Sequence, residues 1–274
     1  MLVFGAAPES AYTHTPTAHI ECRELVELSG IVPATAGREF WGHNDSGHPP
    51  VLFRFNDHGE VLQRVALSPA VNVDWEGMTI DAAGAIYVGD FGDNRRRRSD
   101  CTIYKVAEPA PDADKIAPAA ARRFAYPDGK ARDCEAVFAM GGRLYLISKE
   151  ASPLTRPTVF CLNDFSIQAK PEGADGKNAV GPSADTIVLR EVGRLQIGGL
   201  VTGAAYSPSR KELAVLTYSG VMFYAVEEEA DLLRPAQGAI GGYFGQCEAI
   251  CYDGNDVIIT NEPGTIWRMS VRDR

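Results

Sequence analysis

The sequence lacks the features that mark several large classes of protein. No stretch approaches the roughly 18 consecutive apolar residues that cross a bilayer, so we expect neither a transmembrane helix nor a membrane partner. The six cysteines form no C-x-x-C pair, which leaves zinc ribbons and thioredoxin-like sites without support. Basic residues are in the minority, 27 against 36 acidic ones, and the net charge of −9 argues against a nucleic-acid partner.

Signatures of catalysis and secretion are scarce as well. The chain contains no G-x-S-x-G elbow and no P-loop, so a serine triad or a nucleotide-binding Walker motif is unsupported. Residues 1–17 contain no Lys or Arg, which makes them a poor signal peptide. Scattered cysteines are typical of buried positions in a reducing compartment, so we expect a cytoplasmic protein. A secreted location stays open if a signal peptide once preceded this sequence.

The sequence does contain a fivefold repeat. Each repeat has a short core in which an acidic or hydroxyl residue is followed by a tiny residue and then an apolar one. The five cores are SGI at 29–31, EGM at 76–78, EAV at 135–137, TGA at 202–204 and EAI at 248–250. They are spaced by 47, 59, 67 and 46 residues. This is about the size of a four-stranded propeller blade with variable loops.

Each core is followed by further segments that have the composition of strands. The second segments, such as AIYVGDFGDN and RLYLISKE, and the third, such as CTIYKV and GVMFYAV, are rich in Val, Ile, Tyr and Phe and are bounded by turn residues. Fourth strands are expected at EVLQRVALS, RRFAYP, DTIVLREVGRL and AIGGYFG. Apart from a possible turn at VEEEADLLR, we find no apolar stripe of helical length.

The fifth repeat ends after its third strand, GTIWRMSV, and so lacks an outer strand. The N-terminal segment AHIECRELVEL can supply it, which would close the ring and remove an open sheet edge. The sequence therefore predicts an all-β fold, a five-bladed β-propeller whose last blade is closed by the N-terminal strand. We expect residues 1–18 to be an extension and residues 19–274 a single domain. A sixth blade would need one more repeat, and the longest gap holds only a polar, Gly-rich loop.

In a propeller the first strand of every blade lines the central channel, so the first core residues should form a ring around the axis. These residues are Ser29, Glu76, Glu135, Thr202 and Glu248. Crowded carboxylates raise one another's pKa, and a hard cation removes the conflict. The ring offers oxygen ligands, which favours Ca²⁺, with Mg²⁺ as second choice because its geometry is stricter. Cys134 and Cys247 should point away into the sheet packing. Alternatively, the acids only cap turns.

The second strand of a blade runs back antiparallel, so its end lies on the same face as the start of the first strand. Asp74 and Glu76 should therefore lie near Asp90 and Asp93. The polar rim predicted on this face consists of His43, Asn44, Asp45, Asp90, Asp93, Asn94, Lys149, Glu150, Tyr218, Asn261 and Glu262. Asp45 or Asp90 could act as general base and Lys149 could neutralise developing charge, while the others would bind substrate. Tight turns also favour such residues, so a purely structural role is the alternative.

Four consecutive arginines, Arg95 to Arg98, form the one concentrated basic feature of this acidic chain. If their loop folds over the channel mouth, Arg95 and its neighbours could hold a phosphate or a carboxylate. A solvated loop is the alternative interpretation.

The order Ser, Glu, Glu, Thr, Glu resembles the axial calcium ring of the calcium-activated nucleotidases (apyrases), which are five-bladed propellers. The phrases DWEGMTID, GDFGDN and DCEAVF are similar to bacterial propellers grouped with esterase-like phytases. The resemblance implies that Ser29, Glu76, Glu135, Thr202 and Glu248 hold Ca²⁺. The long nucleotide-contacting loops of the apyrases are not found here, which weighs against nucleotide hydrolysis.

Two functions follow from these patterns. The first is a calcium-dependent hydrolase of a small anionic or ester substrate at the channel mouth. Phosphate esters or anhydrides are the preferred substrates, with lactones or carboxylic esters a close second. The second is a non-catalytic binding or scaffold propeller with a structural axial calcium, because propellers support many functions.

Overall fold

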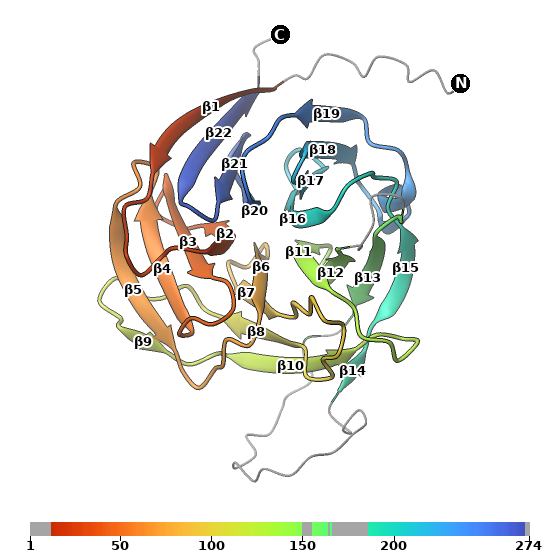
Figure 1. Ribbon diagram of the computed structural model, residues 1–274, viewed down its shortest axis with the longest axis horizontal. Helices are drawn as coiled ribbons and strands as arrows, with labels where there is room; N and C mark the ends of the chain where they lie inside the picture. Colours follow the sequence, from red (N-terminus) through yellow and green to blue (C-terminus); the bar gives the residue numbers. More distant parts are fainter. Residues whose placement is uncertain (1–11, 150–154, 164, 166–185, 272–274) are drawn as a thin grey trace.

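The computed structural model describes residues 12–149, 155–163, 165 and 186–271, and it consists almost entirely of strands. Five sheets stand like blades around a common axis, each with its innermost strand nearest the centre (Figure 1). The five-bladed β-propeller predicted from the repeat is thus confirmed. In the described part of the chain the one helix is the short 3-10 helix η1 (Glu229–Leu233), and no helix is long and apolar enough to cross a membrane.

The strands follow one another from the axis outward in each blade. Blade one comprises β2 (Leu28–Pro33), β3 (Glu39–Asn44), β4 (Val51–Asn56) and β5 (Val61–Leu67). Blade two comprises β6 (Trp75–Ile80), β7 (Ile86–Asp90), β8 (Thr102–Val106) and β10 (Ala120–Ala125). Blade three comprises β11 (Cys134–Met140), β12 (Arg143–Ser148), β13 (Thr158–Leu162) and β15 (Arg190–Arg194). Blade four comprises β16 (Val201–Ser207), β17 (Glu212–Thr217), β18 (Gly220–Ala225) and β19 (Gly238–Gly241).

Blade five joins the two ends of the described chain. It comprises β20 (Cys247–Asp253), β21 (Asp256–Asn261), β22 (Thr265–Val271) and, outermost, β1 (Tyr12–His19). Strand β1 pairs antiparallel with β22, as predicted, and leaves the last blade without an open third strand (Figure 1). It lies earlier in the chain than expected and overlaps the extension assigned to residues 1–18. Most of the predicted segment AHIECRELVEL instead connects β1 to β2.

Two very short strands that the sequence analysis did not identify extend the outer edges of blades one and two. Strand β9 (Lys115–Ile116) leaves the β8–β10 connection and pairs in parallel with β5 of blade one. Strand β14 (Ile187–Val188) comes from the segment before β15 and pairs in parallel with β10 of blade two. The predicted strand DTIVLREVGRL is therefore divided between two blades. Each short strand ties one blade to the next.

The apolar side chains form five buried clusters, and each cluster lies between two neighbouring blades. Trp41 of blade one and Trp75 of blade two are both fully buried in the cluster between those blades. Cys134 and Cys247 also belong to these clusters, so they point away from the axis as predicted. Because the apolar side chains pack between neighbouring blades, they do not fill the axis. The innermost strands can therefore carry polar side chains that face one another there.

Candidate functional site

The five predicted ring residues occupy one structural position. Each is the second residue of its innermost strand, and in each blade the pairing with the next strand shifts there by one residue. A β-bulge of this kind re-aims a side chain, here toward the axis. All five side chains are buried: Ser29, Glu76, Glu135, Thr202 and Glu248.

The tiny residue that follows each ring residue is explained by the close approach of the innermost strands. A Cβ atom on Gly77 would lie 2.8 Å from the carbonyl oxygen of Glu135 in the next blade. A Cβ atom on Gly30 would likewise lie 2.8 Å from the carbonyl oxygen of Glu76. Blades three and five carry alanine at this position. The axis is therefore narrow, and the ring side chains are crowded.

Carboxylates from two adjacent blades meet on one side of the axis. Ligand oxygens of Asp45, Asp74 and Glu76 all lie within 4.8 Å of one another. The hydroxyl of Ser29 donates a hydrogen bond of 2.9 Å to Oε2 of Glu76. Asn72 holds the two loops together, since its amide nitrogen donates to the carbonyl oxygen of Asp45 at 2.7 Å. We call Asp45, Asp74 and Glu76 the acidic triad.

The other side of the axis contains a cation that belongs to the protein itself. The ammonium of Lys149 lies 3.0 Å from Oε1 of Glu135 and 3.4 Å from the hydroxyl of Tyr218. That hydroxyl in turn donates to Oε1 of Glu248 at 2.8 Å. Thr202 donates its hydroxyl hydrogen to the carbonyl oxygen of Cys247 at 2.7 Å. The structure thus divides the acids of the predicted ring into two groups. Glu76 lies in the acidic triad, whereas the charge of Lys149 offsets the negative charge of Glu135 and Glu248.

Burial makes the axial carboxylates hard to ionise. Together with the charges of neighbouring acids, it raises the pKa of Glu76 well above its usual value and that of Asp74 to about 6. Burial also raises the pKa of Asp45. The pKa of Glu135 is raised by burial to about 8, although Lys149 acts in the opposite direction. A divalent cation would relieve this cost at the triad, and its all-oxygen donor set suits Ca²⁺ or Mg²⁺.

The last residue of the second strand has the same role in all five blades. These residues are Asn44, Asp90, Ser148, Thr217 and Asn261. Each accepts a hydrogen bond from a nearby backbone N–H group, at 2.8 to 3.2 Å, and so fixes a loop or turn at this face. Asn44 and Asn261 also donate to backbone carbonyl oxygens. Three of these side chains were predicted as site residues: the contacts occupy Asn44 and Asn261, which were assigned to substrate binding, and Asp90, which was assigned to catalysis.

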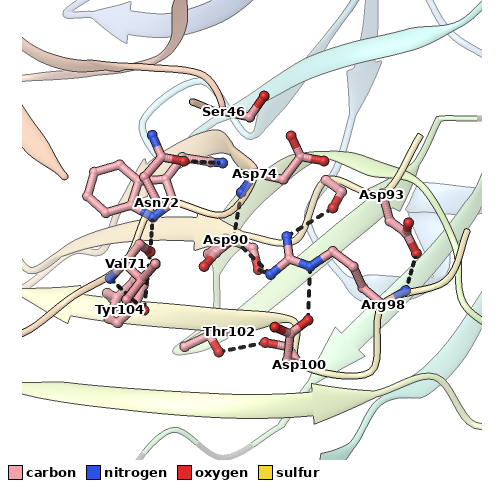
Figure 2. A network of polar contacts seen from close by, with 12 residues as sticks. Ser46, Val71, Asn72, Asp74, Asp90, Asp93, Arg98, Asp100, Thr102 and Tyr104 are labelled. Atoms are coloured by element: carbon pink, nitrogen blue, oxygen red, sulfur yellow. Dashed lines mark hydrogen bonds and ion pairs between the residues drawn. The ribbon is translucent and has the colours of Figure 1, made fainter. Parts of the chain in front are cut away.

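Arg98 forms the centre of a second polar network at this face (Figure 2). Its guanidinium lies 2.9 Å from Oδ1 of Asp90 and 3.0 Å from Oδ1 of Asp100, and it also donates to the carbonyl oxygen of Gly92 at 3.0 Å. The Asp90 carboxylate accepts the backbone N–H of Asp74 at 3.0 Å, as expected for the two ends of one hairpin. Figure 2 shows the Asp74 carboxylate turned away from Arg98. Arg98, the last of the four arginines, therefore stabilises its own loop and the end of β7 through internal contacts.

The remaining predicted rim residues have varied surroundings. His43 is fully buried edge-on against Trp75 with ring centroids 5.2 Å apart, and burial lowers its pKa to about 4, so it is neutral. Asp93 is buried and accepts the backbone N–H of Arg98 at 2.7 Å. Glu262 is half-buried and accepts a hydrogen bond from Gln246. The last three predicted residues are Asn94 and Arg95, which are exposed, and Glu150, which lies outside the described residues.

Two acids near the axis were not among the predicted site residues, and Asp45 was predicted as a general base rather than as a ligand. Asp74 and Asp133 each stand two residues before a ring glutamate, in DWE and DCE. The Asp133 carboxylate accepts the backbone N–H of Asp93 at 3.1 Å, whereas Asp74 joins the triad. The recurrence of D-x-E in two repeats is the sequence signal that could have identified both positions.

Known structures resemble the chain in fold alone. An aldose sugar dehydrogenase from Streptomyces coelicolor in its PQQ-bound form is 12% identical with a TM-score of 0.52, over 97% of this chain and 99% of that one. An auxiliary nutrient binding protein from Bacteroides thetaiotaomicron is 10% identical with a TM-score of 0.52, over 96% and 77%. A gluconolactonase from Xanthomonas campestris is 12% identical over 90% and 87%, with a TM-score of 0.45.

At the level of sequence, no family model and no curated protein matches the chain. The resemblance to apyrases and esterase-like phytases therefore stays a prediction.

Proposed function

We propose that this chain is a metal-dependent hydrolase that binds a divalent cation, preferably Ca²⁺, at the acidic triad. The observation that carries the proposal is the convergence of Asp45, Asp74 and Glu76 within 4.8 Å at the mouth of the axis. Among the described residues, none of the three forms an ion pair with a basic side chain. Three buried or half-buried carboxylates in this arrangement are costly without a cation.

The preferred substrates are phosphate esters or anhydrides, with lactones and carboxylic esters as second choice. A cation bound at the triad would polarise a phosphoryl or carbonyl oxygen and lower the pKa of a bound water. Asp45 is half-buried on the loop after β3, and burial raises its pKa. If it binds the cation through one carboxylate oxygen, its other oxygen is placed to accept a proton from the bound water. Asp90 is a weaker candidate for the general base because Arg98 already pairs with it. Lys149 would stabilise negative charge that develops near the axis.

The cation site is tested first by melting curves of the chelator-treated protein with added CaCl₂ or MgCl₂. We expect Ca²⁺ to raise the melting temperature more than Mg²⁺, and we expect Asp74→Asn and Glu76→Gln to abolish the rise. Glu262→Gln is the matched control, because this rim acid lies outside the triad. A Ca²⁺ response that survives both triad substitutions would overturn the site.

Activity is tested by product release from phytate, nucleotides, lactones and nitrophenyl esters, with calcium and with chelator. If Asp45 moves a proton in the reaction, Asp45→Asn should lower kcat by about 10²-fold or more even at calcium concentrations that still raise its melting temperature. Loss of turnover in chelator, together with loss in Glu76→Gln, would support the hydrolase. If no substrate turns over under any metal condition, the hydrolase proposal fails.

A structural cation in a non-catalytic propeller is the second candidate, and one observation favours it. Asp45 comes from blade one while Asp74 and Glu76 come from blade two, so a cation would join these blades. The Lys149 group joins the other three in the same way, through Glu135 of blade three, Tyr218 of blade four and Glu248 of blade five. In this case the triad substitutions would lower only the thermal stability.

A further inference from the structure

A basic cavity lies at the mouth face between blades two and three. It has a volume of about 200 Å³, and its lining includes Arg96, Lys130, Arg132, Asp133 and Lys149. Four of these side chains are cationic and one is acidic, in a chain whose net charge is −9. The sequence analysis singled out the arginine run that contains Arg96 but not the second basic segment. The fold brings the two segments together.

Two of the four cations are available to a ligand. Arg96 and Lys130 are exposed, and within the described ranges neither forms an ion pair with a carboxylate. Arg132 is held in place by Asp128, with nitrogen–oxygen distances of 2.7 and 2.8 Å, and its guanidinium also lies over the ring of Tyr126. The cavity therefore combines two exposed cationic side chains, which interact with Asp133 and Asp128 only at longer range, with one guanidinium that Asp128 holds in place. Two such charges match a dianion.

Lys149 links the cavity to the axial carboxylates. This residue lines the cavity, and its ammonium also lies 3.0 Å from Oε1 of Glu135. Asp133 forms part of the wall and is fixed there by the backbone N–H of Asp93 at 3.1 Å. An anion in the cavity would thus lie beside the axial carboxylates.

We propose that this cavity binds a phosphoryl group, with Arg96 and Lys130 as its main charge partners and Arg132 as an oriented donor. The binding itself does not require catalysis. Its use as a substrate subsite rests on the proposed hydrolase, and in that case it selects phosphate esters or anhydrides over uncharged lactones.

The test is calorimetric titration of the full chain with inorganic phosphate at low ionic strength, in the presence of chelator so that the triad carries no metal. The variant Arg96→Gln with Lys130→Gln should bind phosphate at least about tenfold more weakly. The matched control is Arg95→Gln with Arg97→Gln, which removes two charges from the same loop but from outside the cavity. The control should bind within about twofold of the parent protein. Melting curves verify that both variants are folded.

The outcomes separate this proposal from the hydrolase. Absence of saturable phosphate binding, or equal weakening in the two paired variants, overturns the cavity as an anion site. Phosphate binding without any turnover supports the cavity as an anion site and contradicts the proposed hydrolase activity. Turnover of a phosphate ester whose KM is unchanged by Arg96→Gln with Lys130→Gln keeps the hydrolase and overturns the cavity as its subsite.

Discussion

The ammonium of Lys149 lies 3.0 Å from Oε1 of Glu135, and the pair lies at the axis where blades three, four and five meet. Burial acts against the ammonium, but Glu135, Tyr218 and Glu248 together hold the pKa of Lys149 above its usual value. The acidic triad across the axis has no comparable basic partner among the described residues. The propeller thus compensates two axial acids, Glu135 and Glu248, with its own lysine, and in the described part of the chain the three acids of the triad form no such pair.

Replacing Lys149 should destabilise the protein strongly. Lys149→Met leaves the carboxylate of Glu135 buried without its partner, and breaking such a pair costs about 3 kcal/mol or more of the free energy of unfolding. Urea denaturation measures the loss. The double variant Lys149→Met with Glu135→Gln should recover much of it, because no charge is then left unpaired. A single variant as stable as the parent protein would contradict the pairing.

The stability of the metal-free protein should fall as the pH rises from 5 to 9. Burial and the neighbouring acids raise the pKa of Asp74 to about 6 and that of Glu76 well above its usual value, so the folded state holds protons that the unfolded state has already lost. A state that binds more protons is favoured at low pH, and the advantage disappears as the pH passes each folded pKa.

Calorimetric melting in chelator, at intervals of one pH unit, measures this dependence. With CaCl₂ present, the pH dependence that comes from the triad should be reversed. The cation binds the ionised carboxylates, so the stabilisation by calcium should grow as the pH rises. Asp74→Asn is the control and should flatten the part of the profile near pH 6. A chelated protein that is most stable near pH 8 would contradict the raised pKa values.

Arg98 should be the one structural member of the arginine run. Its side chain is 11% exposed and pairs with Asp90, which is 3% exposed, whereas Arg97 is an exposed residue of the same loop. Arg98→Ala leaves Asp90 uncompensated and should lower the free energy of unfolding by about 3 kcal/mol. Arg97→Ala is the matched control and should leave the urea midpoint unchanged. Equal effects of the two substitutions would show that Arg98 is no more than a solvated charge.

Much of the fold could be predicted because each blade corresponds to one repeat of the sequence. The five cores carry an acid or hydroxyl, a tiny residue and an apolar residue, and each of these has a physical cause in the structure. The first is turned to the axis by a bulge, the second permits neighbouring strands to touch, and the third enters a cluster between blades. Strands β9 and β14 could not be predicted in this way, because a strand of two residues is too short to show an alternating pattern.

The candidate site was less predictable because it depends on distances between blades. The sequence placed Lys149 on the rim, but its length and the position of Glu135 decide that it reaches the axis. Asn44 and Asn261 are typical of polar rims, and their partners are loop backbones that the sequence does not locate. Residue type therefore identified which groups face the mouth, while the fold decides which of them remain available for a ligand.

Gly77, the tiny residue in the core of the second repeat, should be essential for blade packing rather than for chemistry. Gly77→Ala would place a Cβ atom 2.8 Å from the carbonyl oxygen of Glu135 and 3.1 Å from the backbone nitrogen of Val137, and backbone atoms of an inner strand cannot easily move. Overpacking of this kind costs about 1 to 3 kcal/mol. Gly37→Ala is the control, because a Cβ atom there meets nothing within 4 Å. Urea denaturation of both variants decides the matter: a Gly77→Ala protein as stable as Gly37→Ala would mean that the innermost strands are not in contact.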